Sequence, residues 1–286
     1  MGPVLARLAL IGALLGFGAC SPLPPGDAAH DVTLMSFNIR TSSADDGANA
    51  WDHRAAHAAA LIASQAPDIL GLQEAQPGQV EFLRERLPAY RFIARSREAD
   101  ASVGEAVPLL FHSERWALDP AEHGTFWLSD TPDLPASKSW GNNFPRIVTW
   151  ARLVHRQSGR GLYVYNLHLD HESENARARS AELVLRRVTS RRYPDPVVVL
   201  GDFNAEPGSA VLRTLQSGEP RLRDSYTPKG SGDGTFHAFS GDRDGPRIDY
   251  ILVAAHLDVL HASIVHDVAG GRYPSDHFPV QASVRF

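Results

Sequence analysis

A short polar segment, Gly201-Asp202-Phe203-Asn204, directly follows the apolar run of residues 196–200. A short, continuous β-branched run is typical of a strand that is covered on both faces. Polar residues at the carboxyl end of such a strand face the crevice in which α/β proteins usually bind ligands. A carboxylate and a carboxamide at this position indicate phosphate chemistry, although the same four residues can also form an ordinary Asx turn.

Recurrence of this arrangement favours a site over a single turn. Three further apolar runs end in polar residues: Asn38 after residues 32–37, Glu74 after residues 69–73, and His168 and Asp170 after residues 162–167. Nearer the C-terminus, Asp249 begins an apolar run and the pair Asp276-His277 precedes the last one. Opposite strand polarity would bring these late residues to the same edge of the sheet as the others.

Phosphoester hydrolysis needs an attacking water made more basic, charge stabilisation on the phosphoryl oxygens and help for the leaving oxygen. A divalent ion and fixed hydrogen-bond donors supply these requirements. Glu74 is a hard oxygen ligand suited to Mg²⁺ or Mn²⁺, and Asn38 and Asp276 could complete the shell. The sequence therefore predicts a Mg²⁺ (or Mn²⁺) site, because this ligand set argues against a dedicated zinc cage.

The ordered motifs resemble the endonuclease/exonuclease/phosphatase superfamily, whose members include pancreatic deoxyribonuclease and bacterial sphingomyelinases. The motifs lie between residues 32 and 286: Ser36-Phe37-Asn38, Leu72-Gln73-Glu74, Gly104-Glu105, Asn166-Leu167-His168-Leu169-Asp170, Gly201-Asp202-Phe203-Asn204, Arg247-Ile248-Asp249-Tyr250 and Ser275-Asp276-His277. Residues 127–132, 145–152 and 235–237 look like a bacterial metal-dependent hydrolase branch of this superfamily. The resemblance implies an α/β four-layer sandwich of two mixed β-sheets flanked by helices, as in deoxyribonuclease.

The resemblance also implies roles for the catalytic residues. Asp202 would orient or deprotonate the attacking water, and Asn204 would hold that water or the phosphate. His168 and His277 would donate to the phosphoryl oxygens as imidazolium ions, because a carboxylate bonded to the far ring nitrogen raises the pKa of a histidine. The family pattern supplies Asp249 as the partner of His277 and Glu105 as the partner of His168.

Three further residues are expected to support the site or to bind substrate: Arg146, Asp170 and His237. Arg146 would clamp a phosphate oxygen in a bidentate manner. His237 lies in a loop ahead of the Asp249 strand. Taken singly, Asn38, Glu105 and Arg146 are better interpreted as surface or capping groups, and only the whole set favours a site.

Sequence motifs of other catalytic mechanisms are incomplete or absent in the chain. His168, Asp170 and His171 partly match the metal motif of metallo-β-lactamases, but position 166 is Asn where that motif needs its first His, which disfavours a dinuclear zinc site. The chain has no Gly-x-Ser-x-Gly elbow and no Gly-x-x-x-x-Gly-Lys phosphate loop. Its only cysteine is Cys20, so neither cysteine catalysis nor an intramolecular disulfide is expected.

The N-terminal residues predict export from a bacterial cytoplasm. Residues 1–19 form a signal peptide, with Arg7 as its positive region and an apolar stretch too short to span a bilayer. Gly18-Ala19-Cys20 resembles a lipobox in which Cys20 is lipidated, although Phe17 departs from the usual aliphatic residue and leaves ordinary cleavage as an alternative. Residues 20–30 would then be the lipidated N-terminus and a Pro-rich tether. Ser21 indicates the periplasmic face of the outer membrane, with a soluble periplasmic or secreted protein as the alternative.

Residues 31–286 are expected to form one catalytic domain, with helices at about residues 54–64, 79–87 and 175–191 alternating with the strands. The chain carries a net charge of −5, and this lowers the expectation of a duplex nuclease, which normally needs a basic surface. We expect a monomeric phosphoesterase, with diesters somewhat favoured over monoesters. Its substrate would be a small organophosphate, a phospholipid headgroup or nucleic acid, and its membrane contact would be the lipid anchor only. The alternatives are a secreted-type nuclease and a catalytically dead binding module on the same fold.

Overall fold

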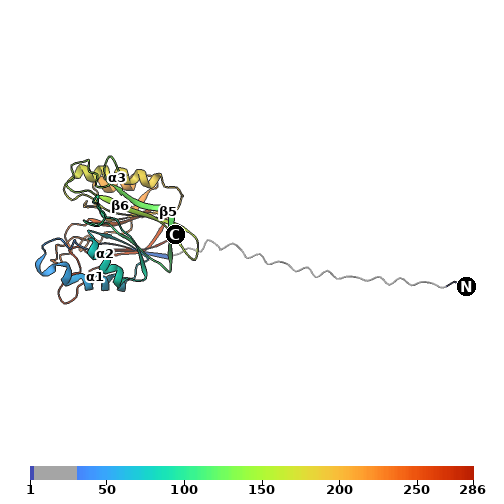
Figure 1. The fold of residues 1–286 in the computed structure, drawn as a ribbon, viewed down its shortest axis with the longest axis horizontal. Coiled ribbons are helices and arrows are strands. Elements are labelled where there is room, and N and C mark those ends of the chain that lie inside the picture. Colours follow the sequence, from blue (N-terminus) through green and yellow to red (C-terminus); the bar gives the residue numbers. More distant parts are fainter. Residues whose placement is uncertain (3–30) are drawn as a thin grey trace.

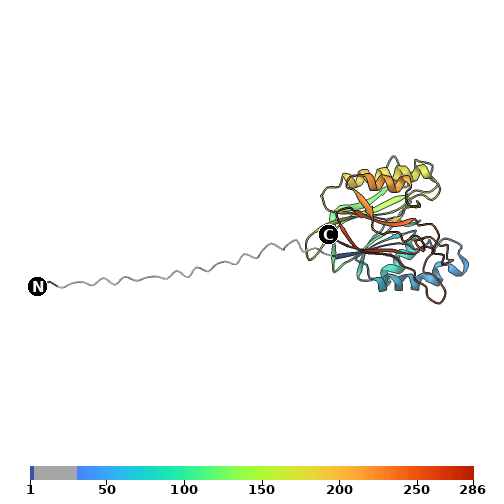
Figure 2. The same cartoon turned by 180° about the vertical axis from the view of Figure 1, so that it is seen from behind.

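The computed structural model describes residues 1–2 and 31–286. The predicted signal peptide, the lipidated Cys20 and the Pro-rich tether therefore lie outside the described residues, apart from the first two. Two β-sheets pack face to face and helices cover both outer faces, as Figures 1 and 2 show. The predicted four-layer α/β sandwich is therefore confirmed.

Each sheet contains six strands and mixes parallel with antiparallel neighbours. The first sheet has the order β11 (Asp258–Ile264), β12 (Val280–Arg285), β1 (Asp31–Asn38), β2 (Ile69–Gln73), β4 (Leu109–His112) and β3 (Tyr90–Ile93). The second sheet has the order β5 (Trp116–Trp127), β6 (Ile147–His155), β7 (Gly161–His168), β8 (Val197–Asp202), β10 (Asp249–Ala254) and β9 (Leu222–Asp224).

The helices lie on the outside of the sandwich. Helices α1 (Trp51–Gln65) and α2 (Pro77–Arg86) cover the first sheet, and α3 (Glu174–Thr189) covers the second together with α4 (Ala210–Ser217) (Figure 1). A short 3₁₀ helix, η1, spans Gly47–Asn49. The predicted helices are present with bounds shifted by one to three residues, and α4 was not predicted.

Strand β8 shows why a continuous apolar run occupies the middle of the sandwich. Side chains alternate across a strand, so Val198 and Leu200 join the core between the sheets whereas Val197 and Val199 pack toward the outer helices. All six residues of β8 are buried. The strand is therefore covered on both faces, as its composition predicts.

Strand polarity places the polar residues at one edge of the sandwich. Strand β1 is parallel to β2, and β7 is parallel to β8, so the carboxyl ends of these strands point the same way. Strand β10 is antiparallel to β8, which sets Asp249 opposite Asp202. Strand β12 is antiparallel to β1, and the residues that precede β12 therefore reach the same edge.

The two sheets approach closely at Gly71 in β2. A Cβ atom at this position would lie 2.1 Å from Leu200 Cδ1 and 2.6 Å from Asn166 Oδ1. The buried Asn166 amide donates to the carbonyls of Leu72 and Pro108 at 2.8 Å and accepts from Gln73 Nε2 at 2.7 Å. This polar link between the sheets fixes the separation of the strand ends that carry the site.

Candidate active site

A cavity of about 650 Å³ opens at the edge where the polar strand ends meet. Most of the predicted site residues line it: Glu74, Glu105, Arg146, His168, Asp202, Asn204, Asp276 and His277. Asn38 and Asp249 are buried and hydrogen-bonded to lining residues. The structure therefore brings together ten of the residues that the sequence nominates.

His277 and Asp249 form a buried ion pair beside the cavity. His277 Nδ1 lies 2.9 Å from Asp249 Oδ2, and both side chains are almost fully buried. Burial alone would lower the pKa of His277, but the charge of Asp249 and its hydrogen bond raise that pKa to about 10. The imidazolium form of His277, which was predicted from sequence, is therefore favoured near neutral pH.

Asp202 is a carboxylate whose pKa lies close to neutrality. Asn38 Nδ2 donates to its Oδ2 at 3.0 Å, and the Nε2 atoms of His168 and His277 lie 3.5 and 3.9 Å from the same oxygen. Burial and the charge of Asp249 raise the pKa of Asp202 to about 7, against the opposing charge of His277. A carboxylate of this kind suits a general base at neutral pH.

Asn204 turns the chain at the lip of β8. Its backbone has a φ of +47°, which asparagine tolerates better than most residues. The Asn204 N–H donates to Asp202 Oδ1 at 2.9 Å, and its side-chain amide donates to the Leu169 carbonyl at 3.0 Å. The turn therefore orients Asp202 and places Asn204 on the cavity wall.

The expected pairing of His168 with Glu105 is not observed. Arg97 Nη1 donates to Glu105 Oε2 at 2.6 Å, and no hydrogen bond joins Glu105 to His168 within residues 31–286. Burial and the positive charges of Arg146 and Arg97 hold the pKa of His168 well below its usual value. The expected imidazolium at His168 is therefore disfavoured, because burial and two guanidinium groups oppose its charge and the expected partner Glu105 is bonded to Arg97 instead.

Arg146 is buried at the cavity wall by contacts with Asp170 and His171. Its Nε lies 3.4 Å from Asp170 Oδ2, and its Nη2 lies 2.7 Å from His171 Nδ1. Asp170 also accepts from the backbone N–H groups of Glu172 and Ser173, so it anchors the segment before α3. Asp170 thus supports Arg146 from outside the cavity, as a supporting residue should.

His237 lies behind the cavity instead of in its lining. Its ring stacks on Phe278 with centroids 3.9 Å apart, and its backbone N–H donates to the Asp276 carbonyl at 2.9 Å. Burial lowers the pKa of His237 to about 4. In this position a neutral His237 packs against the segment that carries Asp276 and His277.

Sequence reasoning did not identify two arginines of the cavity, Arg40 and Arg97. Arg40 Nε lies 3.7 Å from Asp276 Oδ2, and its guanidinium binds Asp46 through two hydrogen bonds. Neither arginine belongs to a motif quoted above. Only the positive φ of Arg40, +54°, marks it as unusual, and that value is known from the structure alone.

Comparisons with known proteins identify the family. The sequence model described as "Endonuclease/Exonuclease/phosphatase family" matches residues 35–277. The chain belongs to the endonuclease/exonuclease/phosphatase family. A solved structure of a member from Bacteroides thetaiotaomicron is 30% identical, with a TM-score of 0.83 over 90% of this chain and 96% of that chain.

A second solved family structure is the mannosyl-6-phosphatase of Bacteroides thetaiotaomicron VPI-5482. It is 31% identical, with a TM-score of 0.81 over 89% of this chain and 100% of that chain. An uncharacterised protein of Acanthamoeba polyphaga mimivirus is 27% identical over 164 residues, which are 54% of this chain and 60% of that protein. Members of this family are phosphoester hydrolases, and the chain is assigned to that class.

Family members generally use divalent metal ions, and the carboxylates of the cavity fit such an ion. Glu74 Oε1 accepts from Asn38 Nδ2 at 3.0 Å, and Asp276 lies close enough that the charge of Glu74 adds to burial in raising the pKa of Asp276. Asp249 Oδ1 is buried without a hydrogen-bond partner among residues 31–286. Several acidic groups at one end of a cavity favour a bound cation.

A more compact acidic group could also hold a metal. Ligand atoms of Asp202, Asp249 and His277 lie within 4.8 Å of one another. His277 Nδ1 is already bonded to Asp249, however, and its imidazolium would repel a cation. Glu74, Asp276 and the amide oxygen of Asn38 suit Mg²⁺ better, because that oxygen accepts the Arg40 N–H at 3.0 Å and no other hydrogen bond among residues 31–286.

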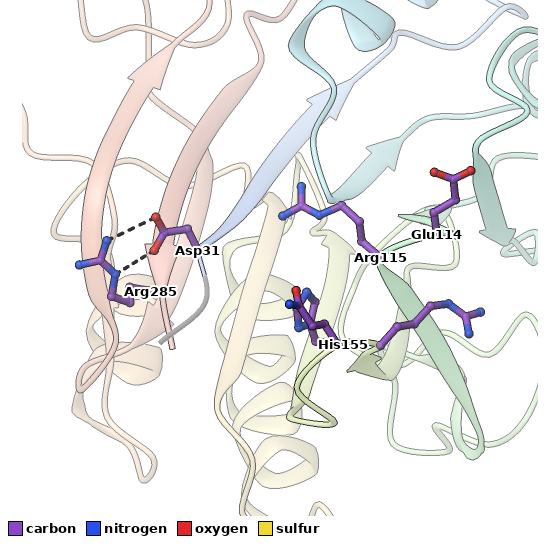
Figure 3. Close-up of a pocket in the computed structure, with 7 residues that line it drawn as sticks. Asp31, Glu114, Arg115, His155 and Arg285 are labelled. Carbon is purple, nitrogen blue, oxygen red and sulfur yellow. Dashed lines mark hydrogen bonds and ion pairs between the residues drawn. The ribbon is translucent and has the colours of Figure 1, made fainter. Parts of the chain in front are cut away.

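A cavity of about 740 Å³ lies at the opposite end of the strands. Asp31 and Arg285, which line it, sit at the far ends of β1 and β12 and bind each other (Figure 3). Arg115 on the same wall is paired with the buried Asp68. The chemistry is assigned to the cavity at the other end, because the predicted site residues line that cavity.

The helices described here are too short or too polar to cross a bilayer.

Proposed function

We propose that this chain is a divalent-metal-dependent phosphoesterase that cleaves small organic phosphates by attack of an activated water. One observation carries the proposal: the ion pair of His277 and Asp249 lies beside Asp202 on the floor of the cavity. A cationic donor and a carboxylate of near-neutral pKa are thus held within 4 Å of each other. Acid–base hydrolysis needs this combination.

In the proposed reaction, Asp202 orients the attacking water and accepts its proton. The imidazolium of His277 donates from Nε2 to a phosphoryl oxygen, because its Nδ1 is held by Asp249. Arg146 contributes a fixed positive charge to the cavity wall, where burial between Asp170 and His171 restricts its guanidinium. Such preorganised donors stabilise charge that develops in the transition state.

Glu74, Asp276 and Asn38 would hold a Mg²⁺ or Mn²⁺ ion. When bound, that ion would neutralise charge on the phosphoryl group and make its bound water more acidic. The chain prepares the ligands in advance, because Asn38 bridges Glu74 and Asp202 and the backbone N–H of Thr41 donates to Glu74 Oε2. These hydrogen bonds keep the pKa of Glu74 low although its burial opposes this.

Cavity size and the mannosyl-6-phosphatase relative favour a small monoester as the first candidate substrate. A volume of about 650 Å³ is typical of small-molecule sites and is ample for a phosphate with one ring attached. A phosphodiester is the second candidate. A neighbouring cavity of about 280 Å³ shares Asn204 and Ile248 with the main one and would accommodate a second arm of the substrate.

The test is hydrolysis of p-nitrophenyl phosphate beside bis-p-nitrophenyl phosphate by the purified protein. Each assay is run with Mg²⁺, with Mn²⁺ and with a chelator. We expect chelator-sensitive cleavage of the monoester at a higher kcat/KM than the diester. Preference for the diester would support the second candidate. If the protein hydrolyses neither ester with any metal, and also cleaves no DNA or phospholipid, a catalytically dead binding module would be favoured.

A further inference from the structure

An exposed aromatic ring, Phe144, stands on the wall of the active-site cavity. It is 45% exposed. Within residues 31–286, the other exposed large apolar side chains lie outside the cavity lining: Val103, Leu134, Leu260 and Val268. An exposed apolar side chain inside a concave site marks a ligand contact more strongly than one on the open surface.

The backbone of Phe144 is fixed by its neighbours. Asn142 Nδ2 donates to the Phe144 carbonyl at 2.6 Å, and Pro145 follows directly. Lys138 Nζ donates to the Asn143 carbonyl at 2.9 Å, and the Asn143 side chain donates to Glu172. Hydrogen bonds therefore hold the segment that carries the Phe144 ring. This reduces the conformational entropy that the segment loses when a ligand packs against the ring.

Two cationic or polar groups orient the ring of Phe144. The Arg97 guanidinium lies over the ring at 5.0 Å from its centroid, and the His171 ring is stacked at 6.4 Å with an interplanar angle of 22°. Arg97 is held by Glu105, and His171 is held by Arg146. These contacts fix the orientation of Phe144 on the cavity wall and still leave nearly half of the residue exposed.

Hydroxyl and amide groups line another part of the same cavity. Thr41, Ser43 and Gln76 all contribute to the lining. Thr41 Oγ1 lies 2.9 Å from Ser43 Oγ, and Gln76 Nε2 donates to Thr41 Oγ1 at 3.0 Å. The cavity thus combines an aromatic surface with neutral hydrogen-bonding groups, and these match a ring that has C–H groups on its face and hydroxyls at its edge.

We propose that Phe144, together with Ser43 and Gln76, forms a subsite for the leaving group, and that this group is a polyhydroxylated ring of the sugar type. This inference rests on the proposed phosphoesterase function. The phosphate lies over Asp202 and His277 at the cavity floor, and the ring packs against the open part of Phe144. Phe144 then contributes to substrate affinity without taking part in the acid–base steps.

The test compares three alkyl phosphates with similar leaving-group chemistry: a hexose phosphate, a nucleoside monophosphate and glycerol phosphate. We expect the full-length protein to show its lowest KM for the hexose phosphate. In Phe144→Ala, the KM for that substrate should rise about three- to tenfold with little change in kcat, as expected for a lost ring contact. The KM for glycerol phosphate should stay within about twofold of its original value, because glycerol has no ring that could pack against Phe144.

Two control variants distinguish the loss of the ring contact from a nonspecific effect of substitution on the protein. Phe144→Tyr keeps the aromatic face and should restore the KM for the hexose phosphate. Leu134→Ala removes a similarly exposed apolar side chain outside the cavity and should leave all three KM values unchanged.

The possible failures are distinguishable. Equal KM values for the hexose and glycerol phosphates, unchanged in Phe144→Ala, would overturn the subsite while leaving the phosphoesterase intact. A lower KM for the nucleoside monophosphate would overturn the sugar-type assignment. No hydrolysis of any alkyl or p-nitrophenyl ester would overturn the proposed function and the subsite with it.

Discussion

At the scale of single residues, two buried histidines of the same cavity have opposite electrostatic environments. His277 is bonded to the carboxylate of Asp249 and has a pKa of about 10. His168 is as deeply buried, but burial and its guanidinium neighbours push its pKa down. His277 is therefore the cationic donor of the site, and His168 acts as a neutral hydrogen-bonding group that faces Asp202 at 3.5 Å.

Replacement of His277 should test this assignment most directly. We expect His277→Ala to reduce kcat by roughly 10²–10⁴-fold, the range typical of a positioned acid–base group. The measurement is the steady-state rate on p-nitrophenyl phosphate with Mg²⁺, beside a circular dichroism spectrum that reports the fold. His256→Ala removes an exposed histidine and serves as the control. Near-normal turnover by a folded His277→Ala protein would contradict the assignment.

At the scale of elements, close contacts between strands fix the geometry of the site. Strands β7 and β8 run in parallel and end at His168 and Asp202, which are register partners. Gly201 precedes Asp202 with a φ of +144°, and a Cβ atom there would lie 2.0 Å from the Leu167 carbonyl oxygen. The absence of a side chain at this position lets β8 approach β7 where the catalytic groups begin.

Gly201→Ala should therefore harm both stability and activity. We expect the free energy of unfolding to fall by about 2–3 kcal/mol and kcat to fall as well, because the backbone shift displaces Asp202. Urea denaturation and the p-nitrophenyl phosphate assay measure the two effects. Gly78→Ala is the matched control, because a Cβ atom at Gly78 has no neighbour within 4 Å. Equal stability of the two variants would show that the close approach at Gly201 is unimportant.

Tyr163, one of two buried tyrosines in β7, predicts a loss of stability at alkaline pH. Burial and the hydrogen bond to Glu122 raise the pKa of Tyr163 to about 12, against about 10 for an unfolded tyrosine. The folded state therefore keeps a proton that the unfolded state releases, and stability falls as pH rises from 10 to 12.

Urea denaturation across this pH window should show that fall, with a shallower slope in Tyr163→Phe than in the unmodified protein. Tyr163→Phe should also lower stability by about 1–2 kcal/mol at neutral pH, because Glu122 loses a buried donor. Tyr193→Phe, which changes a partly exposed tyrosine nearby, is the control. An unchanged slope in Tyr163→Phe would assign the alkaline loss to other groups.

The sequence predicts the strands of the site better than it predicts the rest of the fold. Strands β1, β2, β7, β8 and β10 are largely apolar runs, which are visible in the chain. Strand β11, in contrast, mixes exposed and partly buried residues irregularly at a sheet edge, so its pattern is weak. The Arg97–Glu105 pair could not be foreseen, because no local pattern indicates which partner a buried carboxylate meets.

At the scale of the whole molecule, the active-site cavity and the rear cavity lie at opposite ends of the strands. The starts of β1 and β7 and the end of β12 lie at the rear, where Asp31 pairs with Arg285 and Arg115 pairs with Asp68. The opposite edge gathers the acidic and cationic groups of the active site. Lipidation at Cys20 and the envelope location remain predictions. The described domain begins at Asp31, which lines the rear cavity. If the N-terminus is anchored, the active-site cavity would therefore lie at the end of the domain away from the anchor.

The clustered carboxylates make the folded state sensitive to metal, because a ligand that binds only the folded protein stabilises it. At a Mg²⁺ concentration about 100-fold above the Kd, the expected stabilisation is about 2.7 kcal/mol. For a domain of this size that corresponds to a rise in Tm of roughly 5–10 °C. Thermal unfolding with Mg²⁺ and with a chelator measures this difference without any activity assay.

Glu74→Gln should remove most of that rise in Tm, because the variant keeps the size of the side chain and loses the charge that would bind the ion. Glu114→Gln changes a carboxylate of the rear cavity and should retain the full Mg²⁺ effect. A full Mg²⁺ effect in Glu74→Gln would move the metal to another group, and Asp202→Asn would then test the compact cluster of Asp202, Asp249 and His277. Loss of the effect in Glu74→Gln alone would place the ion among Glu74, Asp276 and Asn38, at the edge where both sheets deliver their polar residues.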